Sequence, residues 1–154
     1  SWQNESLADH DRPLNERGKR DAPRMGRLLR AHGLEPAALI CSTARRARKT
    51  ATKVIEASGY AVDVELRGEL YHAPPDACIE LLQEQADQHP CVMVVGHNPG
   101  MQDLVELLTG LRETFPTAAL AQVKLPIDRW RDLSMNTRGT LVQLWRPKEL
   151  DRLA

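Results

Sequence analysis

One apolar run near the middle of the chain limits the folds open to it more than any other feature. Residues 91–95 read Cys-Val-Met-Val-Val, an uncharged run rich in β-branched valine that is typical of a strand buried on both faces of a parallel sheet. The turn sequence Gly-His-Asn-Pro-Gly follows at 96–100, and a helical pattern begins at Met101. His97 is therefore predicted at the carboxyl end of a core strand, which is the edge where open α/β sheets bind ligands.

Strand-like and helix-like patterns alternate along the whole chain. Further strands are predicted at 38–41, 62–66, 118–125 and 140–145, and helices at 15–33, 42–58, 74–82 and 101–109, with a short helix or loop at 127–133. This alternation predicts an α/β fold with three layers, α/β/α, and a mostly parallel central sheet. No internal repeat or low-complexity linker divides the 154 residues, so one domain is expected.

Local signals mark where several helices begin and end. Pro23 lies inside the first helical stretch and predicts either a kink or a helix that begins near that residue. Ser42 is a favourable N-cap, and Gly59 and Gly110 are placed to end the helices before them. The first helix has no strand before it, although a crossover helix normally follows one. We therefore expect a first strand upstream of Ser1.

Composition excludes several classes of protein. Lys plus Arg and Asp plus Glu each number 21, so the formal net charge is zero and no chain-wide basic field favours nucleic acid or membrane surfaces. Only 4% of the residues are aromatic, which argues against a platform for stacking nucleic-acid bases. Three cysteines without a CxxC pair are typical of a reducing cytoplasm, and no stretch approaches the ~20 apolar residues of a membrane span. We expect a cytoplasmic protein with no nucleic-acid or membrane partner.

A basic cluster follows the predicted strand at 38–41. Arg45, Arg46, Arg48 and Lys49 fall on the first turns of the next helix, where free N–H groups and forked guanidinium groups suit a phosphate. A run of cations is also typical of a solvated helix face. Helical spacing prevents all four side chains from pointing the same way. One of them is therefore expected to turn toward the sheet edge, and the others toward solvent.

His97 and this cluster are predicted at neighbouring strand ends, and the pair is more specific than either feature alone. A loop histidine by itself is more often structural than catalytic. The other four histidines show no HExxH spacing, and the cysteines form no pairs of metal ligands. The sequence therefore indicates a local anion site without a metal or another cofactor.

In these residues the chain resembles the histidine phosphatase superfamily, in the small bacterial branch of SixA-like phosphohistidine phosphatases. The matching motifs are Arg12-Pro13-Leu14 with Gly18, the S-x-x-x-R-A-x-x-T element at 42–50, and Val-Gly-His-Asn-Pro at 95–99. They occur in the family's order along almost the whole chain. The resemblance implies a phosphoglycerate mutase-like fold and a single histidine phosphatase domain over residues 1–154.

The resemblance also implies roles for single residues. Arg46 matches the family's second phosphate-binding arginine, and His97 matches its second active-site histidine. Arg12 is placed at the rim of the pocket, and Asn98 in the same turn as His97 is a further phosphate or substrate contact. Glu69 lies near the position where some relatives keep an acid, so it is a candidate proton donor, with an exposed loop carboxylate as the alternative.

The nucleophile is the largest departure from the family's pattern. The family signature is an Arg-His-Gly or Arg-His-Ala triplet at the end of the first strand, and no Arg-His pair occurs in this sequence. Chains that resemble this one carry the triplet only a few residues before the position of Ser1, in agreement with the expected upstream strand. The nucleophilic histidine is therefore assigned to no position of this sequence.

The activity implied by the resemblance is that of a metal-independent phosphatase. It would hydrolyse phosphohistidine, or a small phosphate ester, through a covalent phosphohistidine intermediate. Its partner would be a phosphorylated protein or a small phosphorylated molecule. The alternative is a catalytically inactive module that binds phosphate or a partner protein and lacks the nucleophile.

Overall fold

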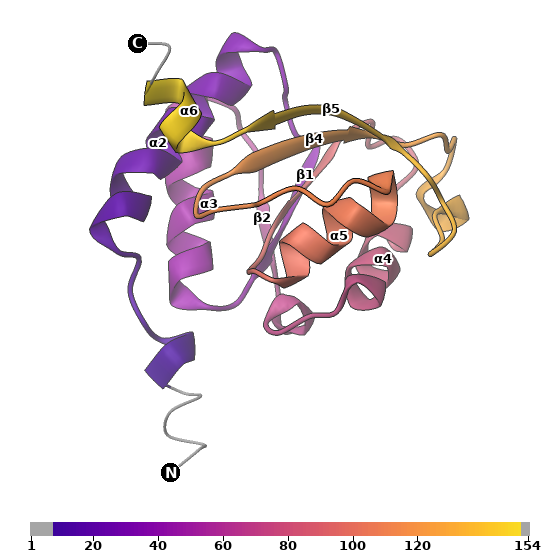
Figure 1. The fold of residues 1–154 in the computed structure, drawn as a ribbon, viewed down its shortest axis with the longest axis horizontal. Helices are drawn as coiled ribbons and strands as arrows, with labels where there is room; N and C mark the ends of the chain where they lie inside the picture. Colours follow the sequence, from indigo (N-terminus) through magenta and orange to yellow (C-terminus); the bar gives the residue numbers. More distant parts are fainter. Residues whose placement is uncertain (1–7, 152–154) are drawn as a thin grey trace.

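The structure, a computed structural model, describes residues 8–151. Within them, strands and helices alternate along the chain (Figure 1). The helices are α2 (Glu16–Ala31), α3 (Arg45–Ser58), α4 (Pro75–Gln83), α5 (Gly100–Thr109) and α6 (Pro147–Asp151), with short 3-10 turns η1 (Gly68–Leu70) and η2 (Trp130–Asp132). The strands are β1 (Ala38–Ser42), β2 (Val64–Arg67), β3 (Val92–Val95), β4 (Leu120–Lys124) and β5 (Thr140–Trp145). Each strand lies where the hydrophobic pattern predicts one.

The strands form two sheets in the described part of the chain. β1 lies between β2 and β3 and runs parallel to both, with Leu39 opposite Val64 on one side and opposite Met93 on the other. β4 and β5 pair antiparallel in a second sheet. The predicted parallel core is confirmed, whereas the last two strands pair with each other and not with that core. Hydrophobic patterns indicate where strands occur, but strand pairing is decided by tertiary contacts.

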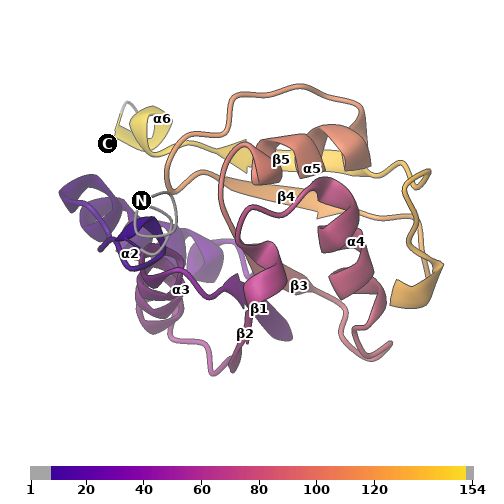
Figure 2. The same ribbon diagram turned by 90° about the horizontal axis from the view of Figure 1, so that it is seen from below.

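Helices cover both faces of the parallel sheet (Figure 2). On one face α3 packs Ala47 and Ala51 against Leu39 and Cys41 of β1, and α2 packs on α3. On the other face α4 and α5 bury Ile40 in a separate apolar cluster. Alternate residues of a strand point to opposite faces, so β1 is buried on both sides. The predicted three-layer α/β/α class is confirmed. No helix in residues 8–151 is both long enough and apolar enough to cross a membrane.

Several helix ends agree with the signals in the sequence. The side chain of Asn15 accepts a hydrogen bond from the backbone N–H of Gly18 at 2.9 Å, which fixes the start of α2. This helix begins at Glu16 and continues through Pro23. Gly59 and Gly110 end α3 and α5 with positive φ angles of 75° and 76°, a conformation that glycine adopts without strain.

Ser42 is not the N-cap of α3, contrary to the prediction. The cap position is Ala44, and Ser42 remains the last residue of β1. The buried Ser42 hydroxyl accepts a hydrogen bond from the Ala44 N–H at 3.2 Å and contacts His97 at the end of β3. The tertiary contact with β3 therefore gives this hydroxyl a role that the local sequence does not reveal.

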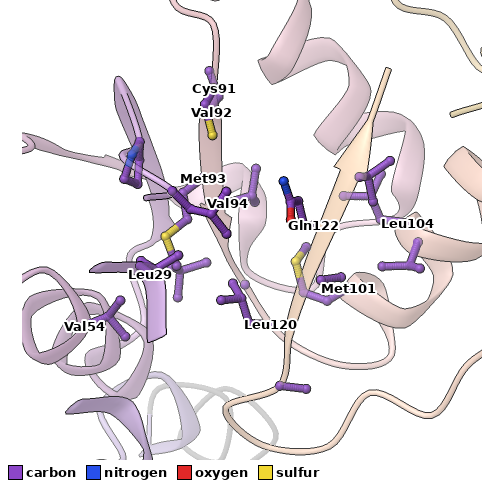
Figure 3. Close-up of a pocket in the computed structure, with 18 of the residues that line it drawn as sticks. Leu29, Val54, Cys91, Val92, Met93, Val94, Met101, Leu104, Leu120 and Gln122 are labelled. Atoms are coloured by element: carbon purple, nitrogen blue, oxygen red, sulfur yellow. The ribbon is translucent and has the colours of Figure 1, made fainter. Parts of the chain in front are cut away.

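A groove of about 1050 Å³ lies between β3 and β4 (Figure 3). Among the described residues, β3 pairs only with β1 and β4 only with β5, so each has one unpaired edge. Leu29 and Val54 line the groove from α2 and α3, and Met101 and Leu104 line it from α5. Because β3 borders this groove, its residues are half-buried, whereas the apolar run at 91–95 predicts full burial.

Candidate functional site

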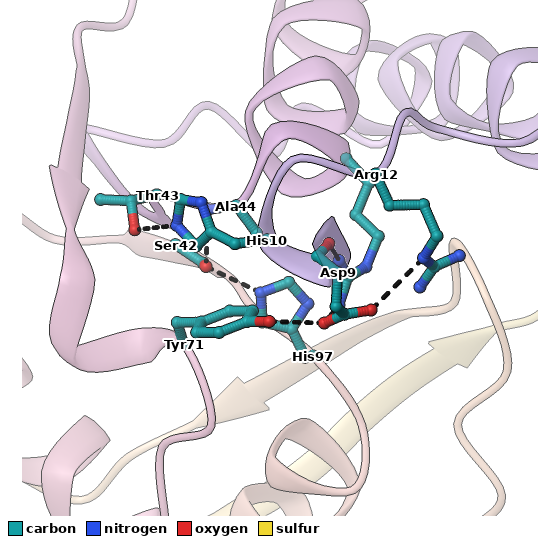
Figure 4. Close-up of polar contacts among 9 residues, drawn as sticks. Asp9, His10, Arg12, Ser42, Thr43, Ala44, Tyr71 and His97 are labelled. Atoms are coloured by element: carbon teal, nitrogen blue, oxygen red, sulfur yellow. Dashed lines mark hydrogen bonds and ion pairs between the residues drawn. The ribbon is translucent and has the colours of Figure 1, made fainter. Parts of the chain in front are cut away.

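Three strand ends converge at the carboxyl edge of the parallel sheet (Figure 4). Ser42 ends β1, His97 lies just beyond β3, and Tyr71 follows β2 through the turn η1. The segment that precedes α2 crosses these strand ends and contributes Asp9 and His10. The predicted location of His97 just beyond the carboxyl end of a core strand is therefore confirmed, and ligand binding at this edge stays a prediction.

His97 is held by a buried hydroxyl and an aromatic ring. Its Nε2 lies 2.7 Å from the Oγ of Ser42, a residue that is 0% exposed. Tyr71 packs edge-on against the imidazole, with ring centroids 5.6 Å apart and an interplanar angle of 88°. These contacts leave the half-buried ring with few orientations.

Burial lowers the pKa of His97 to about 4, and the nearby positive charge of Arg46 acts in the same direction. His97 is therefore a neutral imidazole at pH 7 in the ligand-free protein. Arg46 and His97 line the same groove, and a chain of contacts through Asp9 and Tyr71 links them. A neutral imidazole keeps one N–H, so His97 can still donate a hydrogen bond to an anion.

The lowered pKa of His97 predicts a pH-dependent stability. An unfolded histidine binds its proton near pH 6.5, whereas folded His97 binds one only near pH 4. Between these values the unfolded state holds more protons, so the free energy of unfolding falls as the pH is lowered. For this half-buried group the expected loss is about 1–2 kcal/mol. Urea unfolding at several pH values should show this loss, and His97→Gln should reduce it; equal pH slopes in both proteins would contradict the assignment.

Arg46 is the cation of the basic cluster that turns toward the sheet edge. Its side chain is 20% exposed, whereas Arg45, Arg48 and Lys49 are exposed to solvent. Nη1 donates to the backbone carbonyl of Asp9 at 2.8 Å, and Nη2 lies 3.4 Å from the Asp9 carboxylate. The division of the four cations is the one expected from helical spacing.

Two other predicted contacts lie at the border of the site. Arg12 is largely exposed, and its Nε donates to the Asp9 carboxylate at 3.3 Å, so its contact with a substrate stays a prediction. The Oδ1 atom of Asn98 accepts from the Gln102 N–H at 3.3 Å, and its amide group donates to the Phe115 carbonyl. Asn98 is therefore engaged at the start of α5 and makes no hydrogen bond to the Ser42–His97 pair.

Glu69 lies in a surface group of ion pairs. Its carboxylate accepts from Arg67 Nη2 at 2.6 Å, and Arg67 also bonds Glu65 and Glu84. The hydrogen bond from Arg67 holds the pKa of Glu69 below its ordinary value. This placement matches the alternative of an exposed loop carboxylate, and the role of proton donor stays a prediction.

The structure brings further residues to this edge of the sheet, among them Tyr71, which the sequence suggested only as a rim residue. The Tyr71 hydroxyl donates to the Asp9 carboxylate at 2.5 Å. His10 Nε2 lies 2.9 Å from Thr43 Oγ1, and its ring packs edge-on to Tyr71 at 4.8 Å. One signal was available for Tyr71, because it follows the carboxyl end of a strand parallel to the other two. Asp9 and His10 carry no such local signal.

The arrangement is suited to binding an anion. The guanidinium group of Arg46, the N-terminal turn of α3 and the imidazole of His97 meet at one edge of the sheet. Among residues 8–151, no group of three or more His, Cys, Asp and Glu side chains is placed to hold a metal ion. Forked donors and a helix start are the groups that phosphate oxygens prefer.

Comparisons with known proteins place these observations in a family. The model of the histidine phosphatase superfamily (branch 1) matches residues 2–73, which include Arg12, Ser42 and Arg46. An uncharacterized protein of Mycobacterium tuberculosis is 33% identical over 140 residues, covering 84% of this chain and 85% of its own length. An uncharacterized protein of Mycobacterium leprae is 32% identical over 141 residues, covering 85% and 84%.

Solved structures agree with these matches. A protein of Nakamurella multipartitia, provisionally named phosphohistidine phosphatase SixA, has a TM-score of 0.79 and 26% identity over 90% of this chain and 87% of its own. A protein of Agrobacterium tumefaciens with the same provisional name has a TM-score of 0.73 and 27% identity over 90% and 86%. The protein histidine phosphatase SixA in complex with tungstate shares the fold, with a TM-score of 0.78 and 24% identity over 92% and 88%. The chain belongs to the histidine phosphatase superfamily, and its fold is the phosphoglycerate mutase-like fold of the SixA-like branch.

Proposed function

We propose that this protein hydrolyses phosphohistidine, or a small phosphate ester, through a covalent phosphohistidine intermediate. The observation that carries the proposal is the meeting of Arg46, His97 and the start of α3 at one sheet edge. Membership of the superfamily supports a phosphatase-type hydrolase acting on a phosphorylated protein or small molecule. We also propose a cytoplasmic location, because Cys41, Cys78 and Cys91 are all free thiols.

The site residues follow the needs of phosphoryl transfer. Negative charge is spread over three equatorial oxygens in the transition state, so the protein contributes mainly positioning and positive charge. Arg46 binds two of these oxygens and the N–H of His97 donates to another. Arg12 and Asn98 contact the substrate at the rim. Glu69 would donate the leaving-group proton only after release from Arg67.

The groove between β3 and β4 is where we propose that the nucleophile lies. Both strand edges that face it are unpaired within residues 8–151, and apolar side chains line it from α2, α3 and α5. A strand of this protein that precedes residue 1 would find hydrogen-bond partners on both edges and apolar contacts on both faces there. Running parallel to β3, it would end near Arg46 and His97, which also line the groove. An Arg-His pair at that end would place the nucleophile against the bound phosphate, and residues 1–154 together with such a strand would form one domain.

Replacing His97 by Ala in the protein that includes its natural preceding residues tests the function. Loss of one transition-state donor should lower kcat/KM for a phosphohistidine peptide and for p-nitrophenyl phosphate by about 100-fold or more. The matched control is His32→Ala, at the exposed end of α2, which should keep its activity. Unchanged turnover in His97→Ala would refute the role of His97.

The alternative is a phosphate-binding module without a nucleophile. Its signature would be saturable binding of phosphate or tungstate that depends on Arg46, without any hydrolysis by the protein with its preceding residues. Reading those preceding residues distinguishes the two functions directly. An Arg-His pair there supports the enzyme, and its absence supports the module.

A further inference from the structure

Asp9 is the centre of a hydrogen-bond group, and the proposed chemistry gives no role to Asp9 or to its partner Tyr71. Its carboxylate accepts from the Tyr71 hydroxyl at 2.5 Å and from Arg12 Nε at 3.3 Å, and it lies 3.4 Å from Arg46 Nη2. Its backbone carbonyl accepts from Arg46 Nη1 at 2.8 Å. Asp9 therefore contacts both terminal nitrogens of the guanidinium group of Arg46.

The contacts occupy one particular edge of this guanidinium group. A guanidinium group offers five N–H donors in a planar fork, and it can present two donors at its end, Nη1 and Nη2, or two along its side, Nε and Nη2. Asp9 binds the end. No acceptor among residues 8–151 hydrogen-bonds the Nε of Arg46, so the side of the fork keeps donors for an oxyanion.

We propose that Asp9, held by Tyr71, is a positioning residue for Arg46: it fixes the end of the guanidinium group so that the Nε and Nη2 side binds the phosphate. This inference rests on the proposed function, because it takes Arg46 to be a phosphate ligand. The carboxylate has positive partners in Arg46 and Arg12, so its own charge is compensated while it orients the fork. Tyr71 and Asp9 lie 62 residues apart in sequence, so the pair ties the segment before α2 to the end of β2.

The shifts in acidity of the pair agree with this geometry. The hydrogen bond from Tyr71 is the main cause that lowers the pKa of Asp9, and the charge of Arg46 acts in the same direction. Burial, followed by the hydrogen bond to Asp9, raises the pKa of Tyr71. At neutral pH the phenol therefore keeps its proton and donates it to an ionised carboxylate.

Tungstate binding measured by calorimetry on the protein with its natural preceding residues tests the proposal. Asp9→Asn keeps the shape of the side chain but loses its charge, and Tyr71→Phe removes only the donor. Both should weaken tungstate binding, Asp9→Asn by about tenfold and Tyr71→Phe by less. The effects should not add in the double variant, since each removes the same constraint on Arg46. Asp11→Asn and Tyr60→Phe are matched controls outside the group and should bind as the unchanged protein does.

The sign of the effect separates positioning from competition. If the Asp9 carboxylate instead occupied the phosphate position, Asp9→Asn would bind tungstate more tightly, and that result would overturn the proposal. Unchanged affinity in both variants would also overturn it. With an activated substrate, Asp9→Asn should lower kcat/KM, and Asp9→Glu should restore part of the lost kcat/KM because it keeps the carboxylate. If Asp9 had a purely structural role, the variants would have lower melting temperatures, and Asp9→Glu would not restore kcat/KM. Tungstate binding that is insensitive to Arg46→Ala would refute Arg46 as a phosphate ligand and with it the proposed function, which keeps the two failures distinct.

Discussion

Replacing Arg46 by Lys should lower kcat/KM for phosphate ester hydrolysis by about 100-fold, and replacing it by Ala by about 1000-fold. Lysine keeps the charge but carries its three donors on a single nitrogen, so it cannot offer one planar edge to the phosphate while a second edge binds Asp9. Arg46 is the only member of the basic cluster with a largely covered side chain, at 20% exposure, among residues that the structure describes. Steady-state kinetics on the protein with its natural preceding residues measure the effect.

Arg45→Lys is the control for charge at the start of α3. Arg45 neighbours Arg46 but is exposed, so this variant should keep its activity. Equal losses in the Arg45 and Arg46 variants would mean that the cluster acts as a general basic surface. Full activity in Arg46→Lys would mean that a point charge suffices and that no fork binds the phosphate.

Gly26→Ala should lower the free energy of unfolding by about 2 kcal/mol. A Cβ atom at Gly26 would lie 2.2 Å from the Val54 carbonyl oxygen and 2.8 Å from the Ala57 Cβ. These atoms belong to the facing helix α3, so the substitution forces α2 and α3 apart instead of moving one flexible side chain. Alanine favours a helix over glycine by about 1 kcal/mol, which offsets only part of this cost. Urea unfolding followed by circular dichroism measures the difference.

Gly18→Ala is the matched control in the same helix. A Cβ atom there would meet the tip of the Leu14 side chain at 2.3 Å, and that tip can rotate away. With the same gain in helix propensity, Gly18→Ala should stay within about 1 kcal/mol of the unchanged protein. If Gly26→Ala proves as stable as Gly18→Ala, the close approach of α2 to α3 does not limit stability.

Local patterns predicted the elements that local interactions decide. The strand before His97 and the ends of α3 and α5 at Gly59 and Gly110 could be predicted from the sequence. Valine favours a strand, and a glycine in the left-handed conformation ends a helix, through the local backbone within a few residues. Pro23 was ambiguous from the sequence, because proline can start, kink or interrupt a helix. The start of α2 at Glu16 was decided by the Asn15 cap together with the burial of Ala22, Met25 and Leu29.

Contacts between distant segments could not be predicted in this way. The Ser42 hydroxyl could cap α3 or contact His97, and the choice depends on a residue 55 positions away. Asp9 and Tyr71 show no shared pattern, yet they hydrogen-bond across 62 positions. The separation of β4 and β5 from the parallel sheet also depends on which strands pair with each other, and hydrophobic alternation does not identify a strand's partner.

The sequence by itself determined the α/β class, the location of His97 at a strand's carboxyl end, and the family, through residues at 12–18, 42–50 and 95–99. Periodicity and turn chemistry are properties of neighbouring residues, so one chain is enough to read them. Only the tertiary structure decided which of four cations faces the site, how Asp9 and Tyr71 engage Arg46, and that a groove opens between β3 and β4. These features depend on packing between segments that are far apart in the chain, because helical and strand periodicity fix directions only within one element.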